Sequence, residues 1–122
     1  MLIPARVPDD WRVRCSYFAG AERPPSGPRV SINYRSDSAH EDLSIGESAA
    51  SDPDPIHVAD RSDWEHIDRG GHALLVRARG ERFPESQVRV ERDGTRVYMF
   101  SSSLARERMI ELAAGLVAAP AR

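Results

Sequence analysis

The fold is decided by residues 87–100, which read QVRVERDGTRVYMF. Polar and apolar residues alternate on both sides of Asp93-Gly94. Asp-Gly between alternating segments predicts a two-residue β-hairpin, because a type I′ turn needs positive φ at both central positions. A two-residue loop fixes the register, so Val90 is expected opposite Val97. One face of this hairpin is therefore apolar, and the other carries charged and aromatic side chains.

Further segments alternate in the same way and predict more strands. Residues 11–17 place Cys15 on an apolar face, where a cysteine is expected to act as a small core residue. Residues 72–79 place Leu74, Val76 and Ala78 inward. Short strands in succession predict an antiparallel, meander-like sheet of about five to seven strands rather than βαβ units. The remaining predicted strands are residues 29–35, 42–47 and a brief one at 64–68.

After the hairpin, residues 103–118 are expected to form one C-terminal helix. Ser103 is the predicted N-cap, and Met109, Leu112 and Leu116 recur at helical spacing along one apolar stripe. Such a helix packs on the apolar face of the sheet, so the predicted fold class is α+β. A length of 122 residues suits one domain. Its expected parts are an N-terminal arm (1–10), the sheet (11–102), the helix (103–118) and a tail (119–122).

Composition narrows the setting of the protein. The longest apolar runs fall far short of the roughly 20 residues that span a bilayer, and the first residues lack the pattern of a signal peptide. We therefore expect a cytoplasmic protein, or an extracytoplasmic one if the chain is an excised domain. The single cysteine excludes an internal disulfide framework. All 17 basic residues are arginine, which indicates a GC-rich genome and a bacterial, actinobacterial source.

The outward face of the predicted sheet is rich in arginine. Such a face suits docking of an acidic protein, an anionic ligand or RNA, although arginines that are simply solvated give the same pattern. The residues that we expect to bind a partner are Arg77, Arg79, Arg89, Arg96 and Tyr98. The outward positions opposite the predicted core residues also include Arg12, Arg14, Arg29 and Arg35.

An acidic middle segment offers two alternatives. Residues 36–68 hold ten acidic residues against Arg61 alone, so the acidic middle of one copy could dock on the arginine face of another as a dimer. Residues 57–72 also hold histidines, which would suit a small metal-dependent hydrolase. No histidine pair shows the i, i+4 spacing of H-E-x-x-H. The sequence therefore predicts no metal ligand, cofactor or catalytic residue, and Ser101–Ser103 are expected to cap the helix rather than to act as nucleophiles.

Residues 88–117 carry a family resemblance. They comprise a charged strand, a glycine-containing turn, a second strand and a helix in which Glu107, Ile110 and Leu112 recur. This order resembles the end of the DUF4367-type domain, and the opening Pro8-Asp9-Asp10-Trp11 is similar to that of several small sheet domains of this kind. The resemblance implies a binding or sensing module without catalytic residues, in a family often attached to lipoproteins or to anti-sigma-factor-like regulators.

These observations together predict a non-catalytic binding or regulatory module that acts through protein–protein contacts. A protein partner or self-association is expected. The small net charge of −2 does not favour nucleic acid as the partner. The alternatives are the hydrolase of segment 57–72 and an anion- or RNA-binding sheet face.

Overall fold

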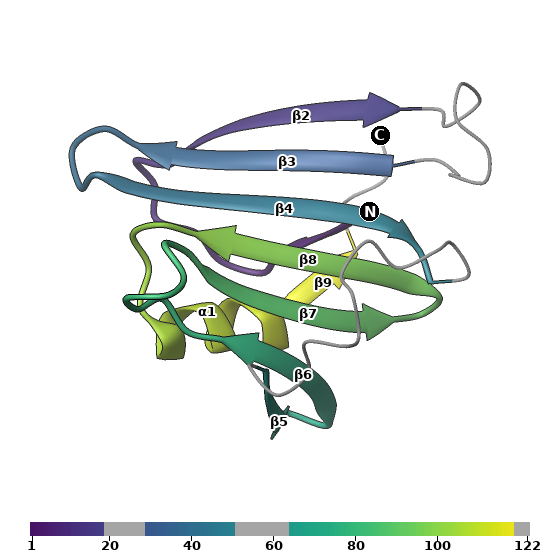
Figure 1. Cartoon of the computed structure of the whole chain (residues 1–122). Coiled ribbons are helices and arrows are strands. Elements are labelled where there is room, and N and C mark those ends of the chain that lie inside the picture. The colour runs from purple at the N-terminus through teal and green to yellow at the C-terminus, as the bar shows by residue number, and fades with distance from the viewer. Residues whose placement is uncertain (19–28, 51–63, 119–122) are drawn as a thin grey trace.

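A computed structural model describes residues 1–18, 29–50 and 64–118 of the chain. Seven of its strands form one antiparallel sheet in the order β2-β3-β4-β8-β7-β6-β5, and β1 pairs with β9 in a separate two-stranded sheet (Figure 1). The elements are β1 (Leu2–Pro4), β2 (Arg12–Phe18), β3 (Arg29–Ser36), β4 (Glu41–Ala49), β5 (Glu65–Arg69), β6 (His72–Arg77), β7 (Ser86–Arg92), β8 (Thr95–Ser101), α1 (Arg106–Ala114) and β9 (Leu116–Ala118).

The predicted fold class is confirmed: an antiparallel sheet is combined with a single C-terminal helix in the described part of the chain. Consecutive strands pair within two groups, β2 to β4 and β5 to β8. The pairing of β4 with β8 joins these groups into one sheet. The meander is therefore interrupted once, at a contact between strands far apart in the sequence.

The β7–β8 hairpin has the predicted turn and register. Asp93 and Gly94 have φ angles of 50° and 77°, as the type I′ turn requires. Val90 lies opposite Val97, and Arg89 lies opposite Tyr98. The brief strand predicted near 64–68 is also present, as β5. β6 ends at Arg77, so Ala78 lies beyond the strand and is exposed instead of facing inward.

The helix is shorter than the predicted segment 103–118. It begins after Ala105, which makes no side-chain capping bond, and ends at Ala114, with Gly115 as its C-cap. Glycine is a poor helix former, and the residues after it extend to pair with β1, where Ile3 lies opposite Val117. The segment 1–10 predicted as an arm therefore contains a strand. The predicted tail, 119–122, lies outside the described residues.

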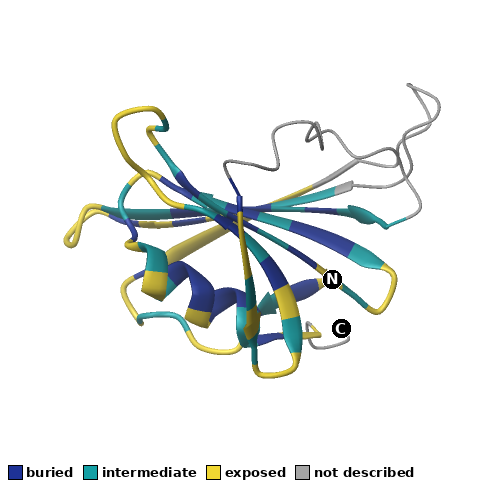
Figure 2. Ribbon diagram, turned by 60° about the horizontal axis from the view of Figure 1, so that its bottom comes forward, coloured by how far each residue is buried: buried dark blue, intermediate teal, exposed yellow. Residues whose placement is uncertain are grey.

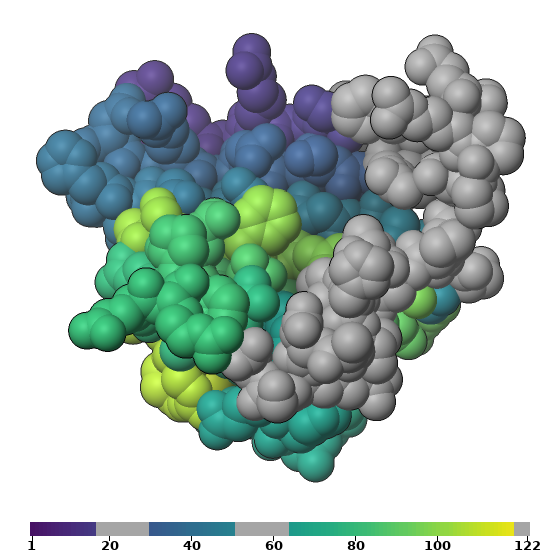
Figure 3. Space-filling model, in the orientation of Figure 1, coloured from purple at the N-terminus to yellow at the C-terminus, as the bar shows by residue number. Residues whose placement is uncertain are grey.

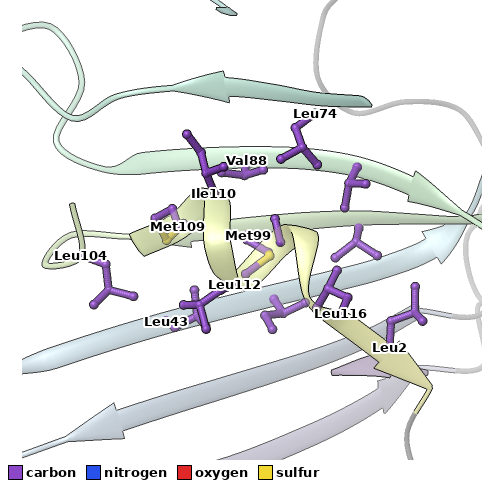
Figure 4. Packing of buried hydrophobic residues seen from close by; sticks show 14 of the residues in the cluster. Leu2, Leu43, Leu74, Val88, Met99, Leu104, Met109, Ile110, Leu112 and Leu116 are labelled. Atoms are coloured by element: carbon purple, nitrogen blue, oxygen red, sulfur yellow. The ribbon is translucent and has the colours of Figure 1, made fainter. Parts of the chain in front are cut away.

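The core lies between the sheet and α1, which packs against β6 and β7. Figure 2 shows the helix under one face of the sheet, with its buried residues turned toward the strands and its exposed residues away. We call this the inner face of the sheet and the opposite one the outer face. Figure 4 shows helix residues meeting strand residues in this layer. Fully buried members include Ile32, Leu43, Ile45, Leu74, Val88, Val97, Met99, Met109, Ile110 and Leu116.

Candidate functional site: the outer face of the sheet

The strands that carry the predicted binding residues lie in one sheet, and the register places these side chains on its outer face. Arg89 pairs with Tyr98 across the hairpin, and Tyr98 pairs with Gly46 of β4. Arg77 lies on the neighbouring strand β6, opposite Gln87. Arg79 lies two residues beyond the end of β6. The register therefore places the strand residues among them on the outer face, and their side chains differ in how far they reach solvent.

Arg89 and Arg96 are held within the face rather than projecting from it. The Arg89 guanidinium contacts Glu91 Oε1 at 3.2 Å and Arg96 Nε contacts the same oxygen at 3.3 Å, with the two arginine side chains only 14% and 7% exposed. Arg96 Nη2 also donates to the carbonyl oxygen of Ala50 at 2.7 Å. Both arginines are thus largely buried rather than exposed on the outward face as expected, and their binding of a partner stays a prediction. Their charges join β7, β8 and the end of β4.

Arg77 and Arg79 are also engaged inside the chain. The Arg77 guanidinium stacks between two aromatic rings, 4.8 Å from the Trp64 centroid and 3.9 Å from the Phe83 centroid. Such cation–π contacts hold a charge near apolar surface. Arg79 is exposed, yet its guanidinium donates to the carbonyl oxygen of Ser102. These arginines shape the outer face at the end of β6.

Exposed guanidinium groups gather at the other end of the outer face, on β2 and β3. Arg12 and Arg35 lie opposite each other in the ladder, and their side chains are each 82% exposed. Both contact Asp37, at 3.1 Å and 3.8 Å respectively. Arg14, on the same face as Arg12, is exposed too. We call Arg12, Arg14 and Arg35 the basic end; in Figure 3 its strands form the purple and blue upper part of the visible face.

A shallow polar pocket adjoins the basic end. It has a volume of about 530 Å³ and lies over β3, β4 and the turn between them. Its walls combine the Arg35 side chain with amide, hydroxyl, imidazole and carboxylate groups. Arg35 of the predicted arginine face and Ser102 of the serine run thus lie in the same pocket. The lining residues are Asn33, Tyr34, Arg35, Ser36, Asp37, His40, Glu41, Asp42, Ser44 and Ser102.

Asp42, in the pocket wall, is fixed by the serines that follow β8. Ser103 Oγ donates to Asp42 Oδ1 at 2.7 Å and Ser102 Oγ donates to it at 2.9 Å, while Ser101 Oγ donates to the Asp42 carbonyl oxygen at 2.6 Å. Partial burial raises the pKa of Asp42, but the hydrogen bonds from Ser103 and Ser102 outweigh it, so the pKa lies below its usual 3.8. The predicted helix-capping role of Ser103 is wrong, because the helix has Ala105 at its N-cap and the Ser103 hydroxyl bonds to Asp42 of β4.

A second carboxylate, Glu47, is buried on the inner face and was not singled out from the sequence. It is 5% exposed, and its Oε1 accepts a hydrogen bond from the backbone N–H of Leu2 at 2.6 Å. Burial raises the pKa of Glu47, and the Leu2 N–H offsets part of that effect. Its position in β4 follows the alternation of Leu43 and Ile45, which is a signal for inward placement. Glu47 thus anchors β1 to the main sheet.

The remaining sequence candidates are dispersed. Cys15 is exposed, so its predicted place in the core is wrong: β2 is an edge strand whose inner face is open at this position. His40 lies in the β3–β4 turn, whereas His66 and His72 lie on β5 and β6 at the other end of the sheet. Across residues 1–18, 29–50 and 64–118, no three His, Cys, Asp or Glu side chains gather as a metal site would require. His57 and the rest of 57–63 lie outside these ranges.

Comparisons with protein-family models, with curated proteins and with solved structures found no match to this chain. The resemblance of residues 88–117 to the DUF4367-type domain therefore stays a prediction. In the part of the chain that the structure describes, α1 is the helix to be considered, and it is neither long nor apolar enough to cross a bilayer.

Proposed function

We propose that this chain is a non-catalytic binding module of a bacterial protein, and that it recognises an acidic protein partner through the basic end of its outer face. The observation that carries the proposal is the exposure of Arg12, Arg14 and Arg35 on two adjacent strands. A guanidinium group matches a carboxylate with paired hydrogen bonds, so closely spaced exposed arginines favour an acidic surface.

The adjoining pocket limits where an acidic partner can sit. It extends from Arg35 to polar groups of β4 and the β3–β4 turn. Its carboxylates, Asp37, Glu41 and Asp42, would repel an acidic segment, so the partner is expected over the basic end rather than in the pocket. Asp42 is already bonded to serines, and this fixes the pocket wall before any partner arrives.

The proposal is tested by binding of poly-L-glutamate, measured by titration calorimetry at low ionic strength. The variant Arg12→Glu/Arg35→Glu should bind at least about tenfold more weakly than wild type, since each reversal replaces attraction by repulsion. Its melting temperature should stay close to that of wild type, because both side chains are largely in solvent. Arg6→Glu/Arg82→Glu makes the same charge change at exposed positions elsewhere and serves as the control.

The competing interpretation, an anion- or RNA-binding face, is examined with single-stranded polyuridylate. RNA binding that exceeds poly-L-glutamate binding and falls steeply as salt rises would favour that interpretation over an acidic protein partner. If wild type bound poly-L-glutamate no better than the Arg12→Glu/Arg35→Glu variant, the proposed function would be wrong.

A further inference from the structure

Strand β2 forms one edge of the main sheet. Its seven residues, Arg12–Phe18, pair one-to-one with β3, and among the described strands none pairs with its other side. An edge strand presents a row of backbone N–H and C=O groups to any extended segment that reaches it. β2 is visible as the outermost strand in Figure 1.

β2 lacks the features that commonly protect an edge. Its sequence, RVRCSYF, contains no proline, and its register with β3 runs without a bulge. The opposite edge strand, β5, has five residues, and its inner-face Glu65 and Arg69 are bound by side chains of α1. β5 is therefore the shorter of the two edge strands and offers fewer backbone groups for additional pairing than β2 does.

The exposed side chains of β2 differ between its two faces. On the inner face, Val13 is 60% exposed and Cys15 is exposed, although Tyr34 and Ile32 opposite them in the ladder are buried. On the outer face, Arg12 and Arg14 are exposed. A strand added to this edge would therefore place alternate side chains beside apolar groups and beside guanidinium groups.

A second copy of the chain is a poor occupant of this edge. Paired residues of antiparallel strands lie on the same face, so two β2 strands would bring Arg12 and Arg14 of both copies together on one face. Like charges directly opposite each other destabilise a sheet, and a pair of β2 strands centred on Val13 would place Arg12 of each copy opposite Arg14 of the other. The complementary occupant carries carboxylates at the positions that flank these arginines.

We infer that β2 binds, by β-strand addition, an extended acidic segment of a partner protein in which carboxylate residues alternate with apolar ones. The carboxylates pair with Arg12 and Arg14 on the outer face, and the apolar side chains cover Val13 and Cys15 on the inner face. Main-chain hydrogen bonds supply affinity in this binding mode, and alternate side chains supply specificity. This inference rests on the proposed function and adds the form and the chemistry of the partner.

The test uses a capped, fluorescein-labelled peptide of alternating glutamate and valine, as long as β2, and measures fluorescence anisotropy. Two further peptides carry N-methyl groups, one on every glutamate and the other on every valine. In an added strand the N–H groups of alternate residues point toward and away from the sheet. One N-methylated peptide should therefore bind like the parent, and the other should lose at least about tenfold in affinity.

Two protein variants test where the peptide lies. Arg12→Glu/Arg14→Glu should bind the parent peptide at least about tenfold more weakly, while Arg6→Glu/Arg82→Glu should bind it as wild type does. A peptide with lysine in place of glutamate should show the reverse preference and favour the Arg12→Glu/Arg14→Glu variant. Circular dichroism establishes that each variant is folded before binding is compared.

Several outcomes would overturn the inference. Equal binding of the two N-methylated peptides would show contact through side chains alone, and a loss of peptide binding in Arg79→Glu but not in Arg12→Glu/Arg14→Glu would place the partner at the other end of the face. A symmetric dimer of wild type in light scattering, abolished by Val13→Pro, would assign the edge to a second copy. In each case binding of poly-L-glutamate to the basic end can persist, so a failure here is distinguishable from a failure of the proposed function.

Discussion

The two ends of the main sheet are held in place by different means. At one end, β5 is fixed to α1, because Arg106 Nη2 contacts Glu65 Oε2 at 2.7 Å and Arg69 Nη1 contacts Glu107 Oε2 at 3.5 Å. At the other end, β2 pairs with β3, and its exposed Arg12 contacts Asp37 of the β3–β4 turn. One end thus has a helix as a second layer, whereas β2 relies on its ladder.

Trp11, immediately before β2, marks the limit of the core at this end. Its ring packs on Tyr34 with centroids 5.9 Å apart, and the Arg108 guanidinium of α1 lies 5.9 Å from its centroid. One position into the strand the inner face is open, since Val13 is 60% exposed. The comparison teaches that strands in one continuous sheet differ in role: β3 to β8 contribute side chains to the core, and β2 offers a surface.

The largest expected contrast comes from shortening an inner-face side chain at each end. Ile67 of β5 is partly buried against the core and lies opposite the buried Leu74. Ile67→Ala should lower the free energy of unfolding by about 2 kcal/mol, since it removes packed methyl groups. Val13→Ala should change it by less than about 0.5 kcal/mol. Urea titration of both variants measures the difference, and equal losses would show that β2 belongs to the core.

A smaller contrast is expected between two aspartates. Asp42 accepts hydrogen bonds from Ser102 and Ser103, so Asp42→Asn should lower the free energy of unfolding by about 1 kcal/mol. Asp37 contacts exposed arginines, so Asp37→Asn should change it by less than about 0.5 kcal/mol. Thermal unfolding at neutral pH gives both values. A larger effect at Asp37 would mean that the β2 end is held by its surface charges.

The pH dependence sharpens the comparison of these aspartates. The folded-state pKa of Asp42 lies below its ordinary value of 3.8, so its charged form stabilises the fold above that value. This contribution is lost as pH falls through the lower folded-state pKa. The stability difference between wild type and Asp42→Asn should therefore be largest above about pH 5, which is roughly one pH unit above the ordinary aspartate pKa. The difference should disappear in strong acid. A constant difference across this range would assign the loss to geometry rather than to charge.

The smallest expected effect concerns the ion pair that ties β5 to α1. Glu65→Gln should lower the free energy of unfolding by about 0.5 kcal/mol, because the pair is partly exposed to water. Hydrogen exchange should show the change more clearly, as faster exchange of β5 amides with little change in β8. Glu111→Gln, at an exposed position on α1, is the control. If the exchange of β5 amides did not change, the ion pair between Glu65 and Arg106 would not be what stabilises this end of the sheet.

Local sequence patterns correctly predicted the features that depend on residues close together in the sequence, such as turns, hairpin register and the buried face of a strand. The turn at Asp93-Gly94 and the pairing of Val90 with Val97 follow from backbone conformations within one hairpin. Alternation also placed Ile32 and Tyr34 on the buried face of β3. The fold class was accessible for the same reason: period-two strands followed by one helical stripe admit few arrangements.

Contacts between distant residues were not accessible from those patterns. Alternation does not say which strand lies at an edge, so Cys15 was predicted to be buried. Arg96 carries a charge at an outward position, and its burial depends on the carbonyl oxygen of Ala50, 46 residues earlier. The end of the helix at Gly115 was missed because the pairing of β9 with β1 joins opposite ends of the sequence. The proposed site lies at the basic end rather than at the arginines of β6 to β8, because contacts between distant residues hold those arginines within the fold.

The pairing of β1 with β9 also bears on how this domain responds to mechanical load. Leu2 lies opposite Ala118, so the chain enters and leaves the fold on adjacent strands, roughly 5 Å apart. Tension applied through both ends would open this ladder one rung at a time instead of shearing it as a whole. The first pairs to part would be those nearest the ends, and the bond between Leu2 and Glu47 would break with them. The seven-stranded sheet would bear load only after this small sheet had opened. The β1–β9 pair would therefore be the first part of the fold to unfold under tension.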